Sequence, residues 1–270
     1  MKNYLTLTLI FLVTIPLFSQ YKLNYEYTYQ YDSKDPTSII KENVTVIKSQ
    51  NERFYFEENQ INKIEVDYLA KINNEDPQLT WEKQGNIPYS KLYNFLIESN
   101  GEISIFHDGL DRYYFRLNKL DNIEWNLSNE NNPTNHQLKK ATANYLGRNW
   151  IAWYDESIPL SEGPFLFTGL PGLIVEMHDN QDFFKWKLSS YNLDFDDKKR
   201  TRNLIDFGLP KANKINELDF KKIMIDNFYD PGTAFSASGM QIEEEKIKKL
   251  IEYKKSQKHR YLIPDLWTYL

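Results

Sequence analysis

GRNWIAWYDESIPLSEGPFLFTGLPGLIVEMHD, residues 147–179, is the stretch of sequence from which we predict the fold. Both of its ends alternate with the period of two that is typical of β-strands. The residues that share a face are Trp150, Ala152 and Tyr154 in the first strand, and Leu173, Val175 and Met177 in the second. Between them, Pro159, Pro164 and Pro171 restrict the unfolded chain and lower the entropic cost of an ordered loop. The segment therefore predicts two strands joined by a stiff loop.

The turn before the second strand has a specific composition. Proline at the second position of Leu170-Pro171-Gly172-Leu173 fixes φ near −65°, and glycine at the third accepts a positive φ. We therefore expect a type II turn here, with Gly172 in the left-handed conformation.

The same stretch resembles the GLPGLI family of secreted bacterial proteins. The six residues that name this family are here Gly169, Leu170, Pro171, Gly172, Leu173 and Ile174. The supporting context comprises Lys139-Lys140-Ala141, Gly147-Arg148, Ala152-Trp153-Tyr154, Ile158-Pro159 and Gly163-Pro164. The resemblance implies export and a β-rich fold, and it implies no particular biochemical activity.

The first nineteen residues have the pattern of a cleavable export signal. Lys2 gives a positive start, an apolar-biased run extends from Leu5 to Phe18, and Ser19 is a small residue suited to cleavage. This run is shorter than the ~20 residues needed to span a bilayer. We expect residues 20–270 to form a single domain that is periplasmic, outer-membrane-associated or secreted, with no transmembrane segment after cleavage.

Further short strands predict that the rest of the chain is mainly β. Residues 21–31 place tyrosines and Leu23 on one face, and 44–48 and 53–57 form a hairpin. The segments 93–98, 103–107 and 113–117 are separated by the turn signals Asn100-Gly101 and Asp108-Gly109. Residues 138–146 and 148–154 pair across Gly147. Residues 59–90 are compatible with a helix or a strand.

We therefore predict an antiparallel curved sheet or half-barrel. C-terminal helices, from about residue 214, are expected to pack on it. The predicted helices run from Asn216 to Tyr229 and from Gln241 to Lys258, and residues 194–202 are expected to form a charged loop.

Composition excludes several classes of function. A formal net charge of −5 argues against nonspecific nucleic-acid binding, and the absence of cysteine removes thiolate chemistry. The standard hydrolase, metalloprotease, P-loop and dinucleotide motifs are absent from the sequence. We expect no catalytic residues, no metal and no cofactor.

A few residues nevertheless stand out as candidates for a site. Glu176 and His178 share a strand face, with Asp179 beside them, and would need a third group to bind a metal or transfer protons. Arg148 near Trp150 is suited to an anion or to pairing with a carboxylate. The remaining candidates for ligand or partner binding are Trp153, Phe165 and Phe167.

Three functions remain open. The leading hypothesis is a noncatalytic envelope or secreted protein that binds an apolar small ligand or a partner protein in a groove lined by tyrosine and tryptophan. The second is an accessory protein of an outer-membrane transport system, recognised through an exposed apolar loop at residues 158–167. The third is a hydrolase-like enzyme that uses Glu176, His178 and Asp179. A hollow concave face favours the first, and a filled face ends the groove hypothesis.

Overall fold

A computed structural model of the chain shows one strongly curved β-sheet. The structure describes residues 20–30, 32, 35–49, 51–90, 92, 94–108, 112–117, 122–195, 198–208, 213–216, 218–219 and 243–256. The twelve strands are ordered β12-β6-β5-β4-β3-β2-β1-β11-β10-β9-β8-β7. All paired strands are antiparallel except β12 and β6, which are parallel. The predicted mainly β, antiparallel curved sheet is confirmed.

The elements have the following bounds. The strands are β1 Gln20–Gln30, β2 Ile39–Ser49, β3 Glu52–Glu57, β4 Asn94–Ser99, β5 Glu102–Asp108, β6 Arg112–Leu117, β7 Asn126–Asn131, β8 Lys139–Tyr145, β9 Arg148–Asp155, β10 Leu173–Asp179, β11 Phe184–Asn192 and β12 Asn213–Lys214. The helices that the structure describes at length are α1 Glu58–Asn73, α2 Pro77–Gly85, α3 Lys198–Gly208 and α6 Glu244–Ser256.

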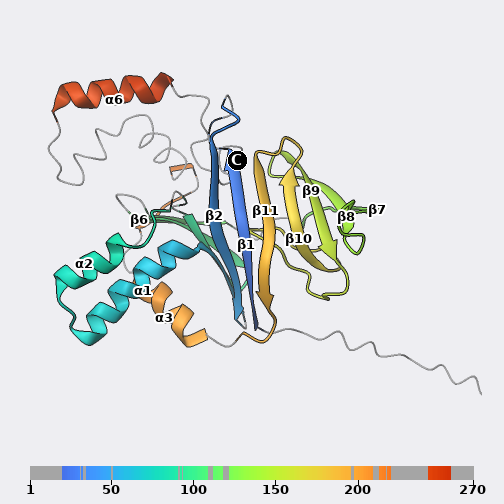
Figure 1. The fold of residues 1–270 in the computed structure, drawn as a ribbon, viewed down its shortest axis with the longest axis horizontal. Coiled ribbons are helices and arrows are strands. Elements are labelled where there is room, and N and C mark those ends of the chain that lie inside the picture. The colour runs from blue at the N-terminus through green and yellow to red at the C-terminus, as the bar shows by residue number, and fades with distance from the viewer. Residues whose placement is uncertain are drawn as a thin grey trace, which may run out of the picture.

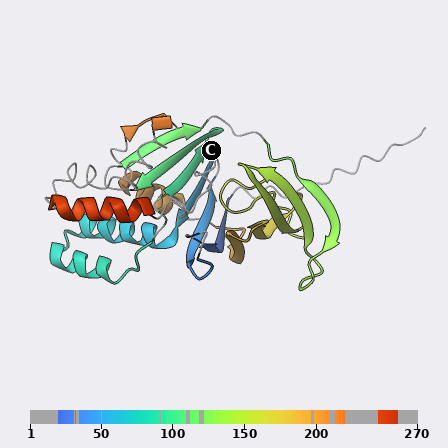
Figure 2. The ribbon, with the colours of Figure 1, turned by 90° about the horizontal axis from the view of Figure 1, so that it is seen from above.

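Strand alternation produces a core on the concave face of the sheet. Along β1, each second residue from Tyr21 to Tyr29 is buried, and the residues between are half-buried. Seen from above, β4–β6 and β8–β10 flank β1 and β2, so the sheet bends around this face (Figure 2). The main hydrophobic core therefore lies inside the bend.

The opposite face carries a second, smaller core beneath helices. Ile47, Phe54, Phe56 and Ile97 form this cluster, and Ile61 of α1 packs against it. Helices α1, α2 and α3 lie together on this side of β2 (Figure 1). Arg202 of α3 also pairs with Glu52 at the start of β3, with 2.5 Å between Nη1 and Oε1. The helices thus cover the outer face of the sheet over β2–β4.

The predicted hairpins are present where their turns are described. Asn100 and Gly101 have φ of 51° and 78°, and Leu146 and Gly147 have φ of 51° and 75°. Positive φ at both central residues is the mark of the tight hairpin turn, which matches the right-handed twist of the strands.

The region at 59–90, which was compatible with a helix or a strand, is largely helical, whereas α3 differs from the prediction. Residues 58–85 form α1 and α2, each begun by an acidic cap: Glu57 accepts from the Gln60 N–H, and Asp76 accepts from the Gln78 N–H. Helix α3 replaces the second half of the charged loop expected at 194–202. The α6 helix confirms the predicted helix over its described length, but it lies at the outside of the molecule with most side chains exposed (Figure 1).

Other predictions fall mainly on residues outside the described part. These are the signal at 1–19, Tyr31, Gly109 and most of the helix expected at 216–229. Its start is supported, because Asn216 Oδ1 accepts the Asp219 N–H at 2.8 Å. In the described part of the chain, no helix has the length and apolar character needed to cross a membrane.

Candidate functional site

The loop at residues 156–172 folds back on itself inside the bend of the sheet. The Ile174 N–H donates to the Glu162 carbonyl at 2.9 Å, and the Leu173 N–H donates to that of Ile158 at 3.2 Å. Its apolar side chains point inward, and Phe165, Leu166 and Phe167 are buried. The 156–172 loop is therefore a core element, and the exposed apolar loop that the accessory-protein hypothesis requires is not what these residues form.

Phe167 occupies the place where we expected an aromatic groove. Its ring lies 4.8 Å from that of Trp150 and 5.9 Å from that of Trp186, between centroids. Tyr25, from the predicted tyrosine stripe, donates its hydroxyl to the Ile174 carbonyl at 2.8 Å. The concave face is thus filled around Trp150, and the groove predicted at this position is absent.

The predicted type II turn is also wrong. Positive φ falls at Gly169, at 97°, whereas Gly172 does not have a positive φ. Gly172 is required for another reason: a Cβ atom there would lie 2.2 Å from the Asp155 carbonyl oxygen. The last glycine of the motif therefore permits a close approach of two backbone segments, and Gly169 supplies the left-handed residue.

A buried ion pair attaches the 156–172 loop to the sheet. Arg53 of β3, about 1% exposed, donates from Nε to Glu162 Oε2 at 3.0 Å and from Nη2 to the Gly163 carbonyl at 2.8 Å. Gly163 itself has no room for a side chain, since a Cβ would lie 2.6 Å from Ile174 Cδ1. One arginine therefore satisfies both a carboxylate and a backbone carbonyl of the loop.

The charges around this pair reinforce one another. Burial lowers the pKa of Arg53, but the negative charge of Glu162, with a further contribution from Glu98, outweighs it and leaves the pKa raised. Burial, and then the negative charge of Glu162, raise the pKa of Tyr21 well above its usual range. Arg53 is thus charged and Tyr21 is protonated at neutral pH.

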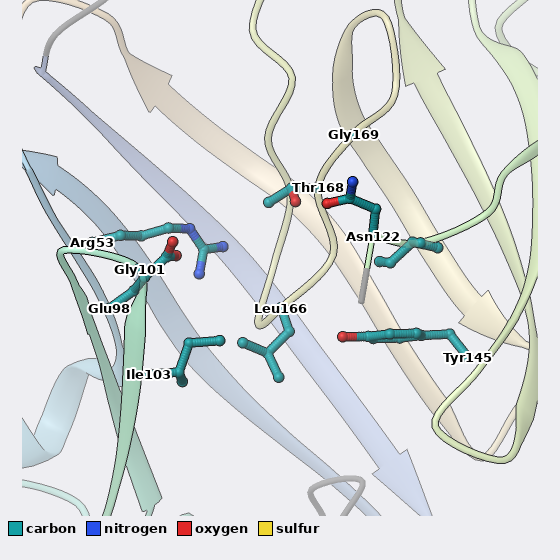
Figure 3. A pocket seen from close by; sticks show the side chains of 10 residues that line it. Arg53, Glu98, Gly101, Ile103, Asn122, Tyr145, Leu166, Thr168 and Gly169 are labelled. Carbon is teal, nitrogen blue, oxygen red and sulfur yellow. The ribbon is translucent and has the colours of Figure 1, made fainter. Parts of the chain in front are cut away.

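Beside Arg53, a pocket of about 400 Å³ remains open between the loop and the sheet. It is lined by Arg53, Glu98, Gly101, Ile103, Asn122, Ile123, Tyr145, Leu166, Thr168 and Gly169. Figure 3 shows Arg53 and Glu98 on one wall and Tyr145 entering from the other, with Ile103 and Leu166 below. A mixed polar and apolar concavity of this size is suited to a small ligand.

The predicted candidates lie elsewhere, apart from Gly169 of the motif. Arg148 pairs with Asp179, with 2.5 Å between Nη1 and Oδ2, and both side chains are buried. Asp179 also accepts the Phe184 N–H at 2.9 Å. The pair thus joins the start of β9 to the end of β10 and the turn before β11, which is the carboxylate-paired role weighed for Arg148.

Glu176 and His178 do not converge on a third catalytic group. Glu176 pairs with Lys187 at 3.0 Å, and His178 Nδ1 lies 2.9 Å from Asp182 Oδ1. Among the residues that the structure describes, no cluster of three or more histidine and carboxylate side chains has the arrangement of a metal site. Trp153 lies on the outer face, with Lys140 Nζ 5.9 Å from its ring.

The sequence analysis missed Arg53, Glu98, Tyr145 and Thr168. One signal for Arg53 was present: in the strand predicted at 53–57 it shares a face with Tyr55, so a charge stands beside an aromatic residue. Its partner Glu162 lies 109 residues away, and local pattern does not identify such a pairing. The pocket depends on the path of the loop.

Comparison with known proteins adds a partial family match. A family model described as "Protein of unknown function (Porph_ging)" matches residues 116–176, which include Tyr145, Thr168 and the motif at 169–174. The expected resemblance is supported in this coarser form, and the family name GLPGLI is not confirmed. Among curated proteins, none matches the chain.

Two solved structures are similar in part. They are PNGF-II in space groups P21 and C2, at 14% and 16% identity and a TM-score of 0.49 in each case. The match covers 78% and 77% of this chain but 34% and 33% of those chains. This chain thus spans about a third of the length of PNGF-II, and nothing about its activity follows from the likeness.

Proposed function

We propose that this chain is an exported, noncatalytic binding protein of the cell envelope, and that its ligand site is the pocket beside Arg53. The observation that carries the proposal is the 400 Å³ pocket left open between the 156–172 loop and the sheet, beside the region filled by Phe167. Phe167 and Trp150 close the centre of the face, so a ligand has space at this end.

Interactions within the protein hold the walls of the pocket in place, so the binding site is preformed. The Arg53–Glu162 pair and the hydrogen bond from Trp125 Nε1 to the Thr168 carbonyl, at 2.8 Å, hold the loop side of the pocket. The opposite side is the β4–β5 hairpin, which carries Glu98 and Ile103. Preorganised walls lower the entropic cost of binding.

The lining favours a ligand that is small and only partly apolar. Ile103 and Leu166 offer apolar surface, whereas Thr168 and Tyr145 carry hydroxyl groups. A purely lipid-like ligand would displace water from the Thr168 hydroxyl and offer it no hydrogen bond in return, which carries a free-energy cost. We therefore narrow the expected apolar ligand to one with an apolar body and a polar end.

A matched pair of substitutions tests the proposal. Thr168→Phe fills the pocket, and Thr142→Phe makes the same change on the outer face of β8. We expect 2-phenylethanol, followed by NMR titration of residues 20–270, to bind the unsubstituted chain and the Thr142→Phe variant but not the Thr168→Phe variant. Equal binding by all three proteins, or by none of them, contradicts the proposed site.

A further inference from the structure

Glu98 is a carboxylate in the pocket wall that shares the nearby Arg53 cation with Glu162. It lies in β4, its side chain lines the pocket, and it is half-buried. In the described part of the chain, no side chain makes a hydrogen bond or an ion pair with it. Figure 3 shows its oxygen atoms beside the Arg53 side chain, on the same wall of the pocket.

Arg53 interacts electrostatically with both Glu162 and Glu98, and its single positive charge cannot balance two carboxylates. Arg53 is bonded to Glu162 at 3.0 Å and to the Gly163 carbonyl at 2.8 Å, on the loop side of the wall. These three side chains together carry one positive and two negative charges. The wall therefore has a net negative charge in a partly enclosed site, where screening by solvent is weaker than at the surface.

Among the described residues that line the pocket, none besides Arg53 is a cation. Ile103 and Leu166 form an apolar surface below, and Tyr145 enters from the far side with its hydroxyl toward the centre (Figure 3). A ligand that reaches Glu98 with one end therefore places its other end against apolar and aromatic surface.

From this arrangement we infer that the pocket binds small amines: a protonated amino group at Glu98 and an apolar body against Ile103, Leu166 and Tyr145. The inference rests on the proposed function and specifies the ligand class for the same site. The ammonium group donates up to three hydrogen bonds, and a charge-assisted bond to a carboxylate is stronger than a neutral one.

Three probes with the same aromatic body separate charge from shape. They are 2-phenylethylamine, 2-phenylethanol and 3-phenylpropanoate, each titrated into residues 20–270 by NMR or calorimetry. We expect the amine to bind at least about tenfold more tightly than the carboxylate, with the affinity of the alcohol between them. A tenfold difference in affinity corresponds to about 1.4 kcal/mol.

Glu98→Gln and a matched control assign the preference to one residue. Glu98→Gln should remove the amine's advantage over the alcohol, whereas Glu176→Gln, on the outer face of β10, should retain it. If Glu98→Gln does not fold, the order of affinity of the three probes for the unsubstituted chain tests the amine preference.

These experiments separate failure of the amine inference from failure of the proposed function. Equal affinity for amine and alcohol, tighter binding of the carboxylate, or an unchanged preference in Glu98→Gln overturns the amine inference and leaves the pocket as a binding site. Failure of all three probes to bind overturns the proposed function as well.

Discussion

Two buried arginine–carboxylate pairs hold the concave side of this protein, and they differ in what surrounds them. Arg148–Asp179 joins neighbouring strands, and the buried Asp179 also accepts a backbone N–H. Arg53–Glu162 joins a strand to the distant 156–172 loop, and Glu162 keeps partial contact with solvent. The first pair is sealed within the sheet, whereas the second borders an open pocket. An ion pair that attaches a loop can thus also form the wall of a site.

The largest effect is expected at the sealed pair. Asp179→Asn removes the buried carboxylate charge that pairs with Arg148, which should lower the free energy of unfolding by about 3–5 kcal/mol. Urea denaturation followed by circular dichroism measures this loss. The exposed pair of Lys187 and Glu176 serves as the control, and Glu176→Gln should cost less than about 1 kcal/mol. Comparable losses in the two variants would show that burial does not set the strength of the pair.

Gly172→Ala should have the next largest effect. Its Cβ would lie 2.2 Å from the Asp155 carbonyl oxygen, so one backbone segment must move, and we expect a loss of about 2–3 kcal/mol in a denaturation experiment. Gly85→Ala is the control, because a Cβ there meets no atom within 4 Å. An unchanged midpoint for Gly172→Ala would mean that the motif is not packed against the end of β9.

Glu162→Gln should cost less than Asp179→Asn, at about 1–2 kcal/mol, because glutamine still accepts from Arg53 and the position is partly solvated. The loss should be local to the 156–172 loop. Limited proteolysis should cut that loop faster in the Glu162→Gln variant while the hairpin of β8 and β9 stays protected. Uniform loosening of the whole sheet would contradict the division between the two pairs.

The smallest effect on stability is expected at Glu57. This carboxylate is buried like Asp179, but it is bound by the N-terminus of α1 and not by an arginine. Its Oε2 accepts the Gln60 N–H at 2.9 Å. Burial raises the pKa of Glu57 despite the opposing backbone hydrogen bonds from Asn59 and Gln60. Folding therefore favours the protonated form. The resulting stability is fully present below the pKa of the unfolded chain and is lost as pH rises through the pKa of the folded chain.

A pH series tests this sign. The free energy of unfolding of Glu57→Gln, minus that of the unsubstituted chain, should increase as pH rises through the titration of Glu57, because only the unsubstituted chain loses stability there. A relative stability that moves in the opposite direction would mean that the cap of α1 lowers the pKa of Glu57.

The strands were predictable from sequence because their alternation is local. Tyrosines at every second position of β1, and positive-φ turn signals such as Asn100-Gly101, have direct structural consequences. The α1–α2 pair was less clear, since the apolar positions of α1 are sparse and none of its residues is fully buried. The acidic cap Asp76 followed by Pro77 was an available signal for the start of α2.

The candidate site was not predictable in the same way. Phe165 and Phe167 in a proline-rich loop suggested an exposed contact surface, but the loop turns inward and fills the face that alternation alone would leave hollow. Phe165 adopts a positive φ of 48°, a strained conformation that its packing against Tyr55 stabilises. Such tertiary compensation leaves no trace in local sequence pattern, so the pocket beside Arg53 appears only once the path of the loop is known.

The central claim is that the concave face is filled around Trp150 and open at the Arg53–Glu98 wall. NMR titration with 2-phenylethylamine tests both parts in one experiment, because Gly101 and Gly169 line the pocket and give separate backbone amide signals, whereas the Trp150 indole reports the filled centre. The account predicts saturable shifts of the Gly101 and Gly169 signals that exceed any shift of the Trp150 indole, whose N–H donates to the carbonyl of Tyr145 at 2.9 Å. A saturable shift of the Trp150 indole without any shift at Gly101 and Gly169 would contradict it.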